Sequence, residues 1–127
     1  MSVNVLSVVN NAMSKAGLNY EFAEWTSDVV YPYWVGEYQE IEPLYENGLL
    51  ESTFLLTGFT RGGWLQLEIE KEKIQKEIFP LAGGLIVTME DGSVVAIFYA
   101  GASVIPTDDA ELKRIEVNLT VKEWKVI

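Results

Sequence analysis

Four glutamates and four aromatic residues lie close together between residues 33 and 46 of this 127-residue chain. Paired carboxylates could serve as a general acid and as a base or nucleophile, and aromatic rings could stack a sugar, so glycoside hydrolysis is the chemistry to consider. The same composition is also typical of a charged loop beside a hairpin whose rings fill the core. The acids are Glu37, Glu40, Glu42 and Glu46, and the rings are Tyr33, Trp34, Tyr38 and Tyr45.

Other groups that could catalyse or bind are scarce. The sequence has no histidine and no cysteine, which excludes the Ser-His triad, thiolate nucleophiles and most zinc chemistry. Asp91 and Asp108-Asp109 lack the loop spacing of an EF-hand calcium site, and a turn explains Asp91 while a loop explains Asp108-Asp109. Gly62-Gly63 precedes an expected helix, but the chain contains no phosphate-binding glycine motif. We therefore expect no metal ion and no cofactor.

The charge distribution limits the partners. Nine cations against nineteen acids give a formal net charge of −10, and residues 1–60 hold one cation, Lys15, against eight acids. Such a field repels phosphate backbones and anionic lipid, so we expect neither specific nucleic-acid binding nor membrane docking. The acidic segment is either a solvated loop that aids solubility or a surface that repels, or that meets a basic partner.

Two helices are expected to position these residues. Apolar residues at helical spacing predict a helix over residues 3–16, with Ser2 as its N-cap and Gly17 just beyond its end. A second amphipathic pattern predicts a helix over residues 63–79, which Pro80 ends. The first residues lack the positive charge and the long apolar run of a signal peptide, so we expect synthesis in the cytoplasm.

An N-terminal hairpin is predicted next. Residues 29–38 and 51–60 are rich in β-branched and aromatic residues, and they flank the acidic connection. Pro32 lacks a backbone donor, so the first of these strands is expected at an edge of the sheet or at a bulge. On such an edge, Trp34 could face a partner.

The C-terminal half is predicted to add three more strands. Asp91-Gly92 joins residues 85–90 and 93–99 as a tight hairpin. Strict alternation from Ile115 predicts a last strand with one buried face and a bulge near Lys122-Glu123. The order of elements predicts one α+β domain over residues 1–127, with two helices packed on one face of a largely antiparallel sheet of about five strands.

Two segments within this order carry a resemblance to a known family. They are residues 32–38 (PYWVGEY) and residues 59–68 (FTRGGWLQLE), each at the start or end of an expected element. Together with the length and the order of helices and strands, they resemble the small tail-terminator proteins of long-tailed bacteriophages and prophages. These proteins are also called tail-completion or tail-to-head joining proteins. The resemblance covers roughly residues 3–125.

The resemblance implies a structural virion protein without catalysis or cofactor. Such subunits form a ring, commonly a hexamer, on the head-proximal end of the tail tube, where the ring stops tube growth and offers a docking face to the head connector. The implied partners are copies of the same chain, the tail tube protein and the head–tail connector proteins, while DNA passes through the ring without specific binding. The implied location is the neck region of the virion tail, after synthesis in the bacterial host cytoplasm.

For such a ring, we expect the four glutamates named above at the lumen or at the rim that contacts the tube. The four aromatic residues are expected in a subunit or tube interface.

Two alternatives to the tail-terminator function stay open. One is a small carboxylate-based enzyme, similar to a glycoside hydrolase, that acts through Glu37 and either Glu42 or Glu46. The other is a different neck or head-completion protein.

Overall fold

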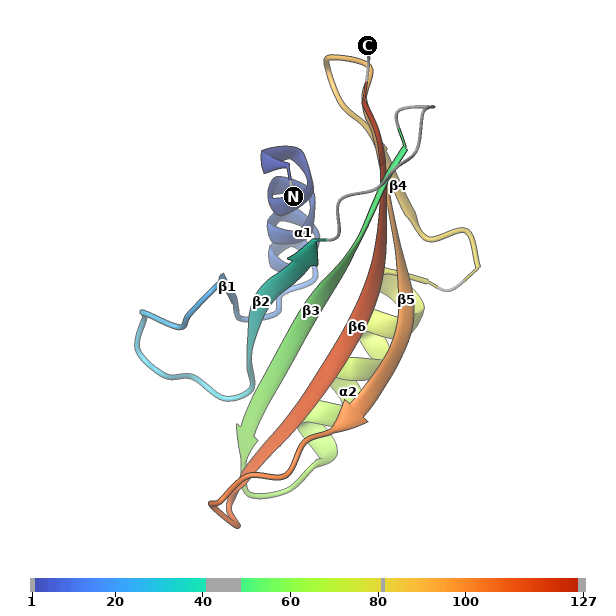
Figure 1. Cartoon of the computed structure of the whole chain (residues 1–127). Coiled ribbons are helices and arrows are strands. Elements are labelled where there is room, and N and C mark those ends of the chain that lie inside the picture. Colours follow the sequence, from blue (N-terminus) through green and yellow to red (C-terminus); the bar gives the residue numbers. More distant parts are fainter. Residues whose placement is uncertain (1, 41–48, 81, 126–127) are drawn as a thin grey trace.

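The computed structural model describes residues 2–40, 49–80 and 82–125. In this part of the chain, two helices lie beside one six-stranded sheet (Figure 1). The helices are α1 (Val3–Lys15) and α2 (Leu65–Lys73), and α2 continues as a π-helical turn over Ile74–Ile78. The strands are β1 (Tyr20–Phe22), β2 (Tyr33–Glu40), β3 (Leu49–Arg61), β4 (Leu85–Thr88), β5 (Val94–Val104) and β6 (Leu112–Trp124).

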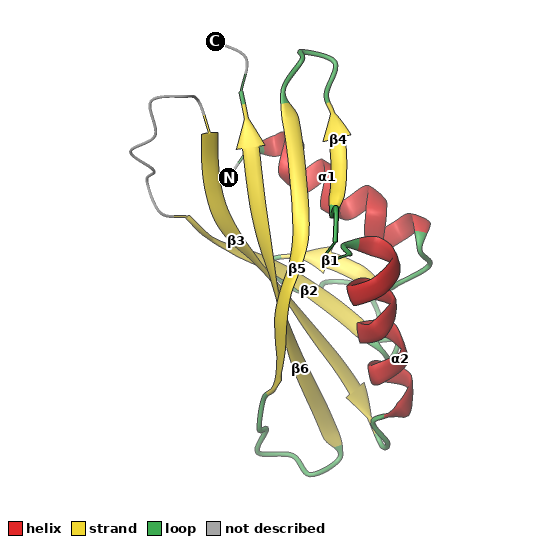
Figure 2. Ribbon diagram, turned by 90° about the vertical axis from the view of Figure 1, so that its right-hand side faces the viewer, coloured by secondary structure: helices red, strands yellow, loops and turns green. Residues whose placement is uncertain are grey.

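The sheet has the strand order β1-β2-β3-β6-β5-β4. Strand β1 runs parallel to β2, and all the other neighbours are antiparallel. Both helices lie on the same face of the sheet (Figure 2). The predicted α+β class and the two helices on one face are confirmed, and the strand number is six rather than about five. The added strand, β1, pairs for only three residues, too few for a sequence pattern to show.

The core lies between the helices and the sheet face that they cover. Alternate residues of β6 are buried there, as their spacing predicts, because successive side chains of a strand point to opposite faces. The helices contribute one buried stripe each. The fully or almost fully buried members include Val5, Val9 and Met13 of α1, Leu67 of α2, Ile74 of its π-helical turn, Phe54 and Leu56 of β3, and Ile115, Val117, Leu119 and Val121 of β6.

The predicted ends of α1 are also confirmed. The hydroxyl of Ser2 accepts a hydrogen bond from the backbone N–H of Val5 at 3.3 Å, which satisfies one of the free donors of the first turn. Gly17 follows the helix with φ of +80°, a left-handed conformation that glycine adopts without strain. Local sequence signals therefore set the boundaries of this helix.

The predicted position of Pro32 is wrong. Strand β2 begins one residue later, at Tyr33, and Pro32 is buried in the preceding loop after a cis peptide bond with Tyr31. The strand is also not at the edge of the sheet, because β1 pairs with it over Trp34–Gly36. The β-branched residues before Pro32 predicted that the strand begins there, but Val29 and Val30 are exposed in the loop.

The predicted bulge near Lys122-Glu123 is wrong as well. Strand β6 pairs with β3 in continuous register, and Glu123 takes the next inward position with only 4% of its surface exposed. The carboxylate is tolerated there because the hydroxyl of Ser2 donates a hydrogen bond to it. The register shift lies instead in β5, between Tyr99 and Gly101.

The second face of the sheet has no helix on it within the described residues (Figure 2). We call it the open face. It carries the side chains that alternate with the core residues, including Phe59 of β3 and Arg114 of β6. Its outer strand on the C-terminal side, β4, also exposes 61% of Ile86. One side of this sheet therefore remains available for contacts.

Candidate functional site

The strand alternation of β2 divides the predicted acidic and aromatic cluster between the two faces of the sheet. Tyr33 and Glu37 line a hollow on the open face. Tyr38 and Glu40 occupy positions of the opposite parity, so their side chains leave the strand on the helix-covered side. Glu37 and Glu40 are both exposed, but they cannot act as a pair on one substrate. Tyr45, Glu42 and Glu46 lie outside the described residues.

Trp34 is a core residue. It is fully buried, and its indole N–H donates a hydrogen bond to a carboxylate oxygen of Glu70 in α2 at 2.9 Å. The ring lies against Gly58 of β3, where any side chain would collide with it. The prediction that Trp34 lies in a subunit or tube interface is therefore wrong, and the residue instead joins β2 to α2.

The hollow on the open face is the candidate functional site. Its volume is about 390 Å³, and it is open to solvent. The loop after β1 forms one wall, and β2, β3 and β6 form the floor. The lining residues are Ala23, Glu24, Trp25, Tyr33, Val35, Glu37, Thr57, Phe59 and Arg114.

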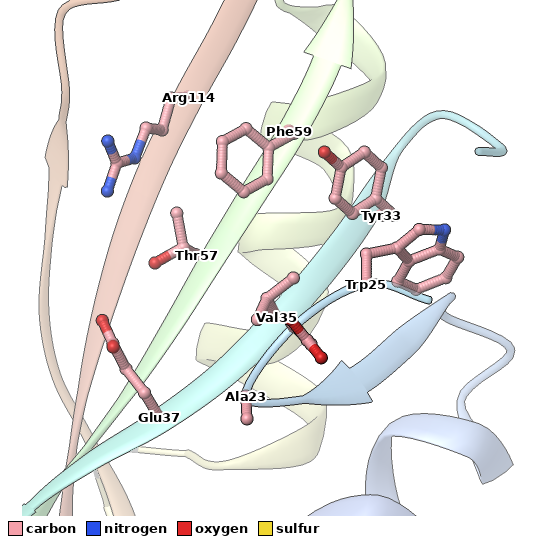
Figure 3. A pocket seen from close by; sticks show the side chains of 9 residues that line it. Ala23, Trp25, Tyr33, Val35, Glu37, Thr57, Phe59 and Arg114 are labelled. Atoms are coloured by element: carbon pink, nitrogen blue, oxygen red, sulfur yellow. The ribbon is translucent and has the colours of Figure 1, made fainter. Parts of the chain in front are cut away.

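Three rings and one cation cross the hollow in a row (Figure 3). The ring centroids of Trp25 and Tyr33 are 4.9 Å apart, and those of Tyr33 and Phe59 are 5.0 Å apart. The Cζ atom of Arg114 follows at 5.6 Å from the centroid of Phe59. The row is regular because Tyr33, Phe59 and Arg114 are direct cross-strand partners in β2, β3 and β6. We call it the aromatic row.

Arg114 ends this row with unused hydrogen-bonding capacity. Its Nε atom is buried and has no hydrogen-bond partner among the described residues. No described carboxylate forms an ion pair with the guanidinium, which makes a cation–π contact with Phe59 instead. The Nε atom itself is enclosed by the subunit, but Arg114 lines the hollow, where the terminal nitrogens of the guanidinium can bind an acceptor supplied from outside the subunit.

Glu21 of β1 holds in place the loop after β1, which carries Trp25 and forms one wall of the hollow. Its carboxylate accepts hydrogen bonds from the backbone N–H and the hydroxyl of Thr26, at 3.3 and 2.7 Å, and from the backbone N–H of Ser27 at 3.2 Å. These bonds, led by the Thr26 side chain, lower the pKa of Glu21. The indole of Trp25 donates to the carbonyl of Asp28 at 3.2 Å. The loop is thus folded on itself and presents Trp25 to Tyr33.

The phenol of Tyr33 belongs to the same row. Partial burial is the main cause that raises its pKa, nearby Tyr31 adds to the increase, and Arg61 opposes it. Tyr33 therefore stays neutral at ordinary pH and can still donate a hydrogen bond. The row offers flat apolar surface, a phenol and a guanidinium, while Glu24 and Glu37 supply carboxylates at the hollow. Such a surface suits recognition of a partner with both apolar and charged groups.

Sequence reasoning did not find Trp25, Phe59 or Arg114. Trp25 follows a strand that is too short to predict, so nothing in the sequence places it beside Tyr33. For Phe59 no face of the predicted strand over residues 51–60 was indicated. For Arg114 a signal existed, because it immediately precedes Ile115 and so falls on the outward parity of the alternation that begins there, where a charged residue points to a surface contact more than to the core.

The candidate cation-binding acids have structural roles in turns. An oxygen of Asp91 accepts the backbone N–H of Ser93 at 2.8 Å, and that bond lowers the pKa of Asp91. Asp109 accepts the backbone N–H of Glu111 and pairs with Arg61 at 2.9 Å, which lowers the pKa of Asp109. No group of three or more acids in the described part of the chain could hold a metal ion.

Comparison with known proteins adds no relative. The chain matches no protein-family model, and no curated protein matches it. None of the described helices is both long enough and apolar enough to cross a membrane. The function is therefore inferred from the fold, the charge and the hollow.

Proposed function

We propose that the protein is a ring-forming tail terminator of a long-tailed phage or prophage. It caps the head-proximal end of the tail tube and joins the tail to the head connector. Its partners are other copies of the chain, with which it forms a hexameric ring, together with the tube protein and the connector proteins. It needs neither catalysis nor a cofactor. The observation that carries the proposal is a sheet whose helices, within the described residues, all lie on one face, and whose other face presents an aromatic hollow to solvent.

A second exposed surface supports assembly. Strand β4 is an edge strand in the described sheet, and its sequence, Leu85–Thr88, contains no charge and no proline. Proteins that stay monomeric usually protect such edges with charges, bulges or covering loops, because an unpaired strand invites another chain. A closed ring requires two unlike surfaces on each subunit, which meet head to tail. The open face supplies one such surface, and the β4 edge is a further exposed site for contact with another chain.

The charge supports passage of DNA through the ring. A net charge of −10 disfavours contact with the phosphate backbone, which a channel for DNA must release. Glu37 and Glu40 leave β2 on opposite faces, so we place these two residues at a rim, where both faces of a strand end are accessible. Reversing two acidic charges between residues 37 and 46, as in Glu40→Lys with Glu42→Lys, should slow DNA transit or assembly. Unchanged assembly and infectivity would contradict this placement.

The direct test is electron microscopy of negatively stained protein, alone at high concentration and then with tail tubes. We expect closed rings, or density that caps one end of each tube and prevents further growth. A protein that remains monomeric and leaves tube ends bare and growing would overturn the proposal. Binding to the connector without binding to tube ends would indicate a different neck protein.

The alternative from another class is a glycoside hydrolase. The hollow contains two carboxylates, Glu24 and Glu37, beside the rings of Trp25 and Tyr33, which is the minimal chemistry for that reaction. A screen with chromogenic glycosides decides the matter. Turnover that disappears in Glu37→Gln would support the enzyme, whereas absence of turnover on every substrate together with tube capping would support the terminator.

A further inference from the structure

Helix α2 carries an exposed apolar stripe on the side that points away from the sheet. Leu65 is 75% exposed and Ile69, one turn later, is 49% exposed. The same stripe continues to Glu72, whose side chain is 60% exposed. Leu67 fills the core from the opposite side of the helix, so the stripe is not required for folding of the subunit. We call Leu65, Ile69 and Glu72 the α2 stripe.

The α2 stripe and the aromatic row have matching spacing. An α-helix advances about 5.4 Å per turn, and the row advances 4.9, 5.0 and 5.6 Å from Trp25 to Arg114. If this helix lies across the strands, successive residues of the stripe therefore fall next to successive side chains of the row. Leu65 and Ile69 would then cover the rings, and Glu72 would reach the guanidinium.

The charges also match in this orientation. Arg114 has a buried Nε atom with no partner and no ion pair to a carboxylate among the described residues. Within the described residues Glu72 forms an ion pair with Lys76 at 4.0 Å, and both side chains are more than half exposed, so the interaction is weak. A glutamate that reaches Arg114 inside a covered hollow would form a stronger, charge-assisted hydrogen bond.

We propose that the α2 stripe of one subunit docks into the hollow of the next subunit and forms the head-to-tail contact of the ring. This inference rests on the proposed ring function and names the surfaces that make it. The stripe and the hollow lie on opposite faces of the same sheet, since α2 passes behind the strands that carry the hollow (Figure 3). Each subunit can therefore give its helix to one neighbour and receive a helix from the other.

Disulfide trapping tests the contact directly, because the chain has no cysteine of its own. Ile69 on the stripe and Val35, which lines the hollow two residues from Tyr33, are replaced together, as Ile69→Cys with Val35→Cys, and the protein is oxidised with tail tubes present. We expect a ladder of covalent oligomers on a denaturing gel. The control combines Ile69→Cys with Ser7→Cys, which places the second thiol on the exposed side of α1. The control should give no ladder beyond a dimer.

Charge exchange provides an independent measurement. Arg114→Glu should raise the concentration at half-assembly by at least about tenfold, as expected for loss and repulsion of a close interfacial charge pair. Adding Glu72→Arg to that variant should restore assembly. Lys122→Glu is the matched control, because Lys122 lies on the same face of β6, over Phe98 rather than in the hollow. It should assemble like the unmodified protein.

The outcomes separate the two proposals. Rings or tube caps that form without a specific ladder, and that tolerate both Arg114→Glu and Glu72→Arg, would overturn the docking contact and leave the ring intact. Failure of the unmodified protein to form rings or caps under any condition would overturn the ring itself. If Arg114→Glu does not fold, as judged by circular dichroism, the exposed variant Glu72→Arg and the cysteine pair still decide the contact.

Discussion

Gly58 in β3 makes room for the ring of Trp34, and one methyl group at this position is expected to disturb the packing of β2 against α2. A Cβ atom on Gly58 would lie 2.7 Å from Cη2 and Cζ3 of Trp34 and 2.8 Å from Cε3. The ring is fully buried, and its N–H is bonded to Glu70. It therefore cannot swing into solvent to avoid the methyl group.

The magnitude follows from three contributions. Overpacking a well-packed core costs about 1–3 kcal/mol. Displacing the ring also weakens its hydrogen bond to Glu70, and a bond to a charged group contributes about 1.5–3 kcal/mol when intact. Against these losses, replacing glycine reduces the entropy of the unfolded chain, a gain of about 0.4–1 kcal/mol. We expect Gly58→Ala to lower the free energy of unfolding by about 2–3 kcal/mol, and Tm by about 10 °C.

The assay is chemical and thermal denaturation followed by circular dichroism and tryptophan fluorescence. Gly101→Ala in β5 is the matched control, because a Cβ atom there meets nothing within 4 Å and the φ of Gly101 is not left-handed. Its stability should change by less than about 1 kcal/mol. Combining Gly58→Ala with Trp34→Leu should cost less than the sum of the single changes, since the ring is gone. Equal stability of the two alanine variants would refute the close approach.

Two further predictions concern the N-terminal third of the chain. The pKa of Glu21 should lie below its usual value in an NMR titration, so its contribution to stability is present above the usual glutamate range and is lost as pH falls through the lowered pKa. Glu21→Gln should remove that inflection and alter the fluorescence of Trp25, and an inflection that persists would contradict the assignment. Ser2→Ala should lower the free energy of unfolding by about 2 kcal/mol in denaturant titrations, because it removes the helix cap and the hydroxyl bonded to buried Glu123. Ser2→Thr should retain most of that stability, and equal losses in both variants would argue against the hydroxyl.

Features that depend on neighbouring residues could be read from the sequence. Ser2 and Gly17 bound α1, Asp91-Gly92 joins β4 to β5, and the alternation from Ile115 places one face of β6 in the core, all as predicted. The same is true of the overall class, with two helices on one face of a mainly antiparallel sheet. These features follow from side-chain periodicity and backbone preference, which operate within a few residues.

The tertiary structure alone decided the features that join distant segments. Strand β1 exists because three residues find a parallel partner in β2, and Glu123 stays in the core register because Ser2 reaches it from the other end of the chain. The hollow likewise collects Trp25, Phe59 and Arg114 from a loop and two strands. Cross-strand register and loop packing bring these residues together, and neither is encoded in the spacing of residues along the chain. The sequence by itself determined which faces are apolar, while the three-dimensional pairing decided which residues share a surface.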